Sequence, residues 1–352
     1  MTNPLTRGLF GPMYCDDAVA TLFSAPAFTR HMLAFEAAWT RALETTGVVS
    51  AAQAEPALQA IIGFEGTDFS AESAVDGLPV PGFVRALRSG LDADVAKAIH
   101  SGATSQDVID SAMALTLLQL EHMLTARLKQ VAKQLAELNQ RFGGAALMGR
   151  TRMQAALPAT ASLRINAWQR AIDGQIDRAA DARAEIAKVQ LGGAIGLRNS
   201  PEGKSDAVAS AVAQELGLSL VPVWHSDRSG PVAFGHWLTL VSGSLGKIGQ
   251  DVALMAQQGL DEIALRGGGG SSAMPHKQNP VAAEAMITLA RFTASQQGAL
   301  AQAMIHEQER SGAAWALEWM TLPPMAEATG AALNHCLALL DQIDRIGSPQ
   351  SR

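Results

Sequence analysis

Apolar residues recur at steps of three and four along most of the chain beyond Ser111, which is the spacing of one face of an α-helix. The clearest run predicts a helix over residues 109–141, ended by Gly143 and Gly144. Its apolar positions are Leu117, Leu120, Leu124, Leu128, Val131 and Leu135. Three more long helices are expected, over residues 158–189, 230–265 and 280–308. No stretch alternates clearly enough between apolar and polar residues to predict a strand.

The first hundred residues have a different pattern. Shorter helices are expected around residues 25–47 and 54–62, with turn-forming residues between 63 and 82. We therefore predict a small N-terminal helical domain over residues 1–108 and a central domain of long helices over residues 109–352. The fold class is all-α, and the long antiparallel helices form a bundle. Apolar residues all round these helices favour burial against partner subunits in a helical oligomer.

Composition narrows the class of protein. Of 352 residues, 48% are hydrophobic and 17% are charged, so the chain can bury a large core. A net charge of −6 without a basic block gives no electrostatic reason to expect nucleic acid or a membrane surface as a partner. The start lacks a secretory signal, and two cysteines make no disulfide framework. A cytoplasmic protein is expected.

Three polar segments carry the candidate chemistry, and the first runs from His100 to Asp107. It precedes the helix predicted from residue 109, where backbone amides and small hydroxyls can bind an anion. His100 adds a titratable group. The alternative is an ordinary helix start, in which Asp107 caps the helix.

The second segment runs from Gly149 to Pro158 and contains two arginines, Arg150 and Arg152. It reads as a polar loop directly before a helix, with Pro158 in the first helical turn. Guanidinium groups suit carboxylates because they can donate two parallel hydrogen bonds. The alternative is a solvated loop whose arginines face water.

The third segment, from Gly267 to Pro280, joins four glycines to Ser271, Ser272, Met274, Pro275, His276, Lys277, Gln278 and Asn279. The glycines predict a mobile functional loop. A phosphate-binding P-loop is excluded, because the Gly-Lys-Ser/Thr ending and the preceding strand are missing. A plain flexible linker would not contain the run from Met274 to Asn279.

No cofactor and no metal are expected. No dinucleotide-binding fingerprint follows a strand, and no histidine-carboxylate cluster has the spacing of metal ligands. Any catalysis should therefore rest on side chains alone.

The segment from Gly270 to Pro280 resembles the signature of the fumarase/aspartase superfamily, and the first two segments resemble its other conserved regions. The resemblance extends over nearly the whole chain. It implies a helical homotetramer whose active sites each combine conserved regions from three subunits. It also implies a small di- or tricarboxylate as the substrate. Many members continue into a third, C-terminal helical domain, which we expect to be absent here.

The resemblance assigns a role to each motif position. Ser271 would be the base that removes a proton next to a carboxylate, with Ser272 and Met274 supporting the loop. Lys277 and Asn279 would bind that carboxylate, because the aci-carboxylate intermediate needs preorganised donors and a cation. The other substrate acid groups would be bound by Thr104, Ser105, Thr151 and Gln154. His100 is placed among the catalytic residues. Arg228 would bind substrate, because residues 224–228 resemble a His-Thr-x-Arg segment of the family.

One departure from the family pattern bears on the reaction. Lyases of the superfamily usually have histidine after the threonine of the second region, where this chain has Arg152. Arginine cannot serve as a general acid, so the leaving group should not need a proton. A carboxylate leaves unprotonated, and an arginine can hold it. This favours carboxylate addition and elimination, which makes and opens a lactone, by an intramolecular lyase.

Two alternatives remain. One is another lyase of the superfamily, chiefly adenylosuccinate lyase, which shares the His-x-Gly-x-Thr-Ser arrangement of residues 100–105. The other is a non-catalytic structural relative. Glu284 matches the acidic partner of the family histidine, so we also expect it to pair with Arg152 when no substrate is bound.

Overall fold

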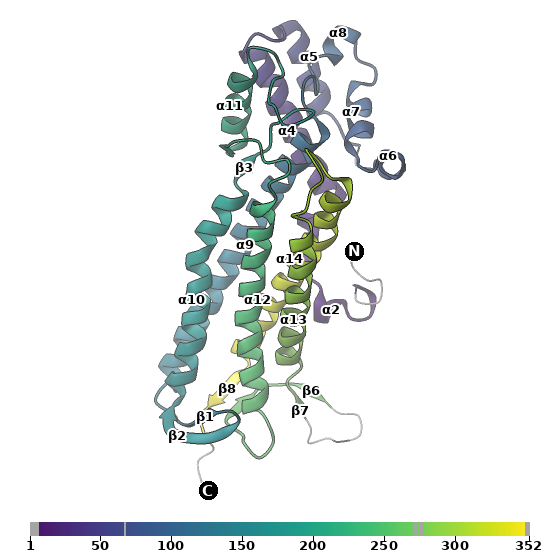
Figure 1. Ribbon diagram of the computed structural model, residues 1–352. Coiled ribbons are helices and arrows are strands. Elements are labelled where there is room, and N and C mark those ends of the chain that lie inside the picture. The colour runs from purple at the N-terminus through teal and green to yellow at the C-terminus, as the bar shows by residue number, and fades with distance from the viewer. Residues whose placement is uncertain (1–6, 67, 271–273, 275–277, 349–352) are drawn as a thin grey trace.

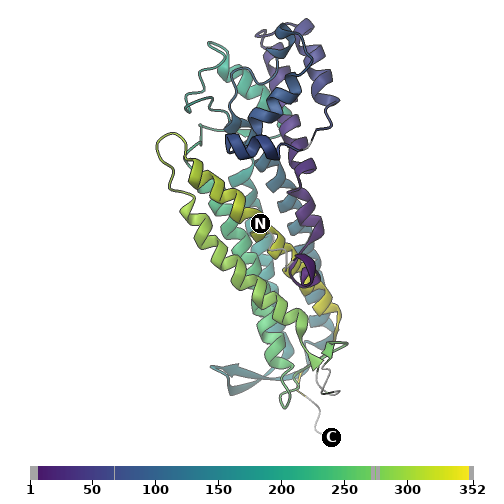
Figure 2. The same cartoon turned by 90° about the vertical axis from the view of Figure 1, so that its right-hand side faces the viewer.

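Long helices dominate the computed structural model, which describes residues 7–66, 68–270, 274 and 278–348. Figure 1 shows an elongated bundle with a cap of shorter helices at one end. The long helices of the described part are α9 (Ser105–Phe142), α10 (Ala161–Ile186), α12 (Ser229–Met255), α13 (Val281–Gln302) and α14 (Gly312–Asp341). Figure 2 shows the same elongation from the side. The predicted all-α class is confirmed.

The cap is formed largely by the N-terminal part of the chain. The helices of this N-terminal part are α2 (Gly11–Tyr14), α3 (Asp17–Leu22), α4 (Ala25–Thr45), α5 (Ala51–Ile62), α6 (Ser70–Asp76), α7 (Val80–Arg88) and α8 (Ala93–Ala96). The later helix α11 (Ser205–Leu216) packs on α4. Helices α2 and α3 instead lie beside the bundle, against α14.

Two hydrophobic clusters make up the core of the described residues. One runs along the bundle and includes Leu124 and Leu135 of α9, Trp168 of α10 and Leu245 of α12. The other lies under the cap, where Phe35 and Trp39 of α4 pack with residues of α7, α9 and α11. Because α11 contributes to the second cluster, the cap includes a segment far beyond residue 108. The boundary at 108 itself stays a proposal.

Short strands form four pairs within the described residues. β1 (Ala146–Thr151) and β2 (Gln154–Thr160) make an antiparallel hairpin, and β3 (Lys188–Val189) pairs in parallel with β4 (Ser219–Leu220). β5 (Ile263–Leu265) pairs with β8 (Ile343–Ile346), and β6 (Gly269–Gly270) pairs with β7 (Gln278–Asn279). The expectation that the chain has no strands is therefore wrong for these short segments.

Several helix boundaries also differ from those predicted. Pro158 lies in β2 opposite Met148, so it does not open a helix, and α10 begins only at Ala161. The helix predicted over residues 230–265 ends at Met255, and residues 263–265 instead form a strand that pairs with β8. α14 was not predicted; it contains Pro323 and Pro324, which usually interrupt a helix. Within the described residues, no helix is both long and apolar enough to cross a membrane.

Candidate active site

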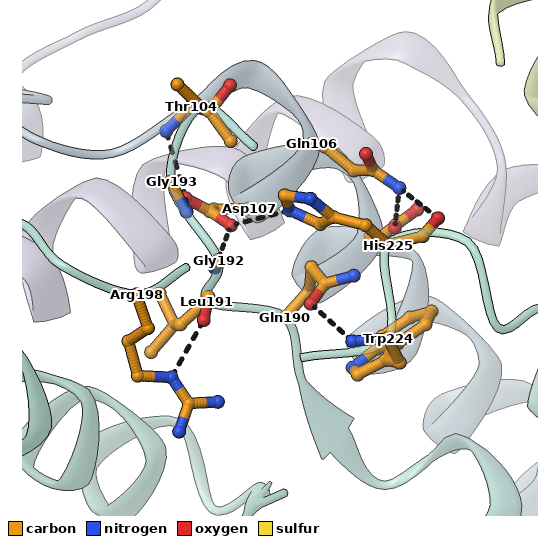
Figure 3. Close-up of polar contacts among 12 residues, drawn as sticks. Thr104, Gln106, Asp107, Gln190, Leu191, Gly192, Gly193, Arg198, Trp224 and His225 are labelled. Atoms are coloured by element: carbon orange, nitrogen blue, oxygen red, sulfur yellow. Dashed lines mark hydrogen bonds and ion pairs between the residues drawn. The ribbon is translucent and has the colours of Figure 1, made fainter. Parts of the chain in front are cut away.

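The first conserved region is held at the start of α9 by one buried carboxylate. Asp107 Oδ2 accepts the N–H of Thr104 at 3.0 Å and that of Gly193 at 3.1 Å, and Oδ1 accepts the N–H of Gly192 at 2.7 Å. His225 Nε2 lies 3.5 Å from Oδ1 (Figure 3). Asp107 therefore caps α9, as the alternative expectation stated, and also ties the helix to the loop after β3.

Arg310 fixes the same helix start from the loop between α13 and α14. Its Nε donates to Gln106 Oε1 at 2.7 Å and its Nη1 donates to Thr104 Oγ1 at 3.3 Å. Gln106 Nε2 donates in turn to the carbonyl of His225 at 2.9 Å. Thr104 and Ser105 remain half-buried at the helix start. They are therefore placed on a rigid, partly accessible surface.

Arg228 lies behind this surface in a buried ionic network. Its Nη1 and Nη2 donate to Asp110 at 2.7 and 3.1 Å, and its Nε and Nη2 donate to Glu318 at 2.7 and 2.6 Å. Trp315 Nε1 donates to Asp110 Oδ1 at 2.9 Å. Burial alone would lower the pKa of Arg228, but the two carboxylates outweigh it and raise the pKa. At 2% exposure the guanidinium has no open side for a ligand; binding of substrate by Arg228 stays an untested prediction.

His100 lies next to this region in a strained backbone conformation. Its φ of 59° is left-handed, which is uncommon for a residue other than glycine. Its Nδ1 is 2.6 Å from Oε1 of Glu36, a residue of α4. The predicted catalytic histidine is thus fixed by a carboxylate that the motif does not contain.

The second conserved region forms the β1–β2 hairpin, not a loop before a helix. Thr151 and Gln154 face each other across a two-residue turn, and both turn residues, Arg152 and Met153, have positive φ. All four are exposed. Arg150 instead turns inward and donates to the buried Glu262 at 2.9 Å. Of the two arginines, Arg152 is therefore the one presented to solvent.

The third conserved region is described only in part. Ser271, Ser272 and Lys277 lie outside the described residues, so their predicted roles stay predictions. Asn279 lies in β7 opposite Gly269, where it borders a cavity of about 240 Å³ with Gly267, Gly268, Pro280, Val281 and Gln342. Met274 and Glu284 are exposed. Among the described residues of this single chain, Arg152 and Glu284 form no ion pair with each other.

These residues separate into two groups at opposite ends of the bundle (Figure 1). The Thr104 end comprises residues 100–110, 190–193, 224–228 and 306–318. The hairpin end comprises residues 146–160, 262–270 and 278–284. The 38 residues of α9 lie between them and span roughly 57 Å at about 1.5 Å per residue. One chain therefore does not bring the three conserved regions together.

The sequence alone did not reveal the partners that hold the Thr104 end. Glu36, Glu318 and Arg310 lie far along the chain from the motif, and only the fold brings them to it. Asp110 follows the first motif by three residues, which gave a weak signal that α9 continues the site. Among the described residues, no group of three or more His, Cys, Asp or Glu side chains could hold a metal ion.

Comparison with known proteins matches this arrangement to one family. A family model described as "Lyase" matches residues 15–292. The 3-carboxy-cis,cis-muconate cycloisomerase of Pseudomonas aeruginosa is 35% identical over 98% of this chain and 77% of its own length. A nitrosuccinate lyase of Streptomyces davaonensis is 32% identical over 95% of this chain and 74% of its own length.

The fold comparison agrees. The crystal structure of the 3-carboxy-cis,cis-muconate lactonizing enzyme from Pseudomonas putida matches with a TM-score of 0.88 and 30% identity, covering 96% of this chain and 77% of that one. The fold and the three conserved regions define a helical enzyme, and the chain belongs to the lyase family of the fumarase/aspartase superfamily. Within that family it is similar both to cycloisomerases and to a nitrosuccinate lyase.

Proposed function

We propose that the chain is a 3-carboxy-cis,cis-muconate cycloisomerase, an intramolecular lyase of protocatechuate (β-ketoadipate) catabolism in the cytoplasm. It would interconvert 3-carboxy-cis,cis-muconate and 4-carboxymuconolactone. Arg152 carries the proposal: it stands at the exposed turn of the hairpin, and it forms no ion pair within the described residues. A guanidinium in this position suits a carboxylate that leaves or attacks without gaining a proton.

In the direction of ring opening, Ser271 removes the proton from the carbon next to a substrate carboxylate. Lys277 and Asn279 stabilise the aci-carboxylate that forms. The carbon–oxygen bond of the lactone then breaks, a double bond forms, and the released carboxylate is held by Arg152. Lactone formation is the reverse: that carboxylate oxygen adds to the double bond and the neighbouring carbon gains a proton.

The remaining substrate acid groups bind near Thr104, Ser105, Thr151 and Gln154. Arg228 acts behind them as a positioning residue, because its donors are already taken by Asp110 and Glu318. The proposal needs no cofactor and no metal. Arg152 stays an electrostatic and hydrogen-bonding group throughout, since it does not exchange its proton.

We propose that the active protein is a homotetramer with shared active sites. The Thr104 end and the hairpin end lie too far apart in one chain to contact one small substrate. An antiparallel partner helix would place the hairpin end of one chain at the Thr104 end of another. The exposed apolar residues Met153 and Leu157 of the hairpin end, and Leu163 in the first turn of α10, fit burial by such a partner.

An assay with purified protein tests the reaction. We expect conversion of 3-carboxymuconate, followed by its ultraviolet absorbance, and no turnover of adenylosuccinate or nitrosuccinate. Ser271→Ala should abolish turnover and keep the oligomer intact. No conversion of carboxymuconate by folded, oligomeric protein would refute the cycloisomerase, and turnover of either other compound would identify another lyase. Normal activity of Ser271→Ala would place the base elsewhere.

Mixing two inactive variants tests the shared site. Arg152→Ala alters the hairpin end and His100→Gln alters the Thr104 end. If each site takes these two ends from different chains, random mixing should restore about a quarter of the sites. Lack of recovery in oligomers shown to contain both variants would place both ends of a site in one chain.

A further inference from the structure

Glu36 is a deeply buried carboxylate with one partner. Its side chain on α4 is 0% exposed, and Oε1 lies 2.6 Å from His100 Nδ1. Its second oxygen, Oε2, is buried without a hydrogen-bond partner in the described part of the chain. A carboxylate buried with so few partners opposes folding. Its presence therefore points to a role at His100.

Three side chains on two helices hold the segment around His100 in place. Thr40 Oγ1 donates to the carbonyl of Ala98 at 2.9 Å, and Trp39 Nε1 donates to the carbonyl of Ser101 at 3.1 Å. Arg88, on α7, donates from Nη2 to the carbonyl of Ile99 at 2.5 Å. These contacts secure the backbone on both sides of His100. They explain how its left-handed conformation, with a φ of 59°, is maintained.

One face of α4 provides most of this support. Glu36, Trp39 and Thr40 are spaced by three and four residues, so they lie on the same side of the helix. Two of them hold the backbone beside His100, and Glu36 alone contacts the imidazole. The buried carboxylate is therefore positioned by the same helix that fixes the histidine.

This contact selects one nitrogen of His100 for chemistry. A carboxylate accepts a hydrogen bond, so Nδ1 carries a proton and Nε2 keeps its lone pair. No hydrogen bond to Nε2 occurs within the residues described. The side chain is 15% exposed, and Nε2 is not among the buried unpartnered atoms of the described residues, so it is the nitrogen that a ligand can reach. Two charged groups bind residues 98–101: Glu36, from α4, contacts the imidazole, and Arg88, from α7, donates to the neighbouring carbonyl of Ile99.

We propose that Glu36 is a positioning residue that holds His100 with its proton on Nδ1 and presents Nε2 as a proton acceptor. The proposal rests on the proposed function. On lactone opening, Nε2 accepts the proton of the Ser271 hydroxyl as that oxygen takes the proton from the substrate, and the bond from Nδ1 to Glu36 stabilises the imidazolium that forms. On lactone formation the proton returns to carbon. The count of protons and charges balances without another reactant.

Glu36→Gln tests the proposal, because glutamine keeps the size of the side chain and removes its charge. We expect kcat with 3-carboxymuconate to fall at least about tenfold, with KM nearly unchanged, and the pH profile of kcat to move. Thr40→Val is the matched control: it removes one hydrogen bond to the same segment without contacting the imidazole, so it should lower kcat less than Glu36→Gln does and leave the pH profile as it is. In a His100→Gln background, Glu36→Gln should lower kcat no further.

A spectroscopic measurement makes the outcome independent of turnover. Nitrogen-15 NMR of histidine-labelled protein reports which ring nitrogen carries the proton, and His100→Gln identifies the signal of His100. We expect the Nδ1-protonated form in the native protein and a loss of this preference in Glu36→Gln, but not in Thr40→Val.

Three results would overturn the positioning role. These are native kcat in Glu36→Gln, a further loss of kcat from Glu36→Gln when His100 is already Gln, or the Nε2-protonated form in the native protein. If the native protein leaves carboxymuconate unchanged but shows the expected ring form, the proposed substrate fails and the positioning of His100 stands.

Discussion

The two ends of the bundle differ in how their polar residues are paired. At the Thr104 end, Asp107, Asp110 and Arg228 are almost fully buried, and each makes several hydrogen bonds within the chain. At the hairpin end, Arg152 and Gln154 are exposed beside an exposed Met153. The buried charges of the Thr104 end are therefore paired within the chain, whereas Arg152 and Gln154 at the turn of the hairpin are open to solvent.

This contrast separates the residues that maintain geometry from those that are free to act. A buried charge must be compensated inside the protein, so Arg228 is bound by two carboxylates even though its motif predicted a substrate ligand. An exposed charge has no such requirement, because water solvates it, so Arg152 needs no carboxylate partner within the chain. Substitution of the buried ionic residue Arg228 should therefore reduce stability, whereas substitution of the exposed Arg152 should reduce activity and leave stability nearly unchanged.

The largest effect on stability is expected for Arg228→Ala. It leaves Asp110 and Glu318 buried without their cation, so the free energy of unfolding should fall by about 3–5 kcal/mol. Urea denaturation followed by circular dichroism measures this change. Arg152→Ala is the control at the hairpin end and should change stability by no more than about 0.5 kcal/mol.

A triple variant sharpens the same comparison. Adding Asp110→Asn and Glu318→Gln to Arg228→Ala removes the two buried negative charges that have lost their cation, so part of the lost stability should be recovered. If Arg228→Ala and Arg152→Ala denature at the same urea concentration, the buried network does not stabilise the Thr104 end and the contrast between the ends fails.

Met153→Gly should raise the stability of the protein, by less than Arg228→Ala lowers it. Met153 has a φ of 70° at the turn of the hairpin, where a glycine is free of the strain that a side chain brings. After allowing for the greater freedom of glycine in the unfolded chain, stability should rise by about 0.5–1 kcal/mol. Thermal unfolding checks this, and activity should persist because Arg152 remains.

The control for this change lies in the same hairpin. Met148 is in the extended strand β1, so Met148→Gly should lower stability by about 0.5–1 kcal/mol. A loss of stability in both variants would show that the Met153 side chain is packed in the oligomer, and that the hairpin end is less open than a single chain indicates.

Local patterns predicted much of the bundle. The leucine spacing predicted α9 over residues 109–141, whereas the helix begins four residues earlier at Ser105, after the cap that Thr104 and Asp107 form. The hairpin could not be predicted in this way. Its turn contains Arg152 and Met153 at positive φ, where such turns usually contain Asn or Gly. In addition, Pro158 is a residue type that is common in the first turn of a helix, so it favoured the wrong prediction.

The sequence predicted which three segments form the candidate site, but it did not predict the contacts between their residues and the rest of the chain. Motif positions named Thr104, Arg152 and Asn279, yet they could not show that the chain places them at two ends. Partners such as Glu36 and Glu318 are separated from the motif by long stretches of sequence, so only tertiary packing identifies them. For the same reason, the sequence did not show that two carboxylates enclose Arg228, whose predicted binding of substrate stays untested.

The smallest expected effect concerns His306, in the loop that also bears Arg310. Burial first, and the nearby Arg228 second, hold the pKa of His306 below its ordinary value of 6.5. Its Nδ1 accepts the N–H of Ser311 at 3.4 Å, which suits the neutral ring. As the pH falls below 6.5, the unfolded chain therefore binds a proton before the folded chain does, and stability declines until the folded-state pKa is passed. In His306→Gln this part of the decline should be absent. The difference in melting temperature between pH 8 and pH 5.5 measures it, and equal differences in native and variant protein would mean that the Thr104 end does not keep this histidine neutral.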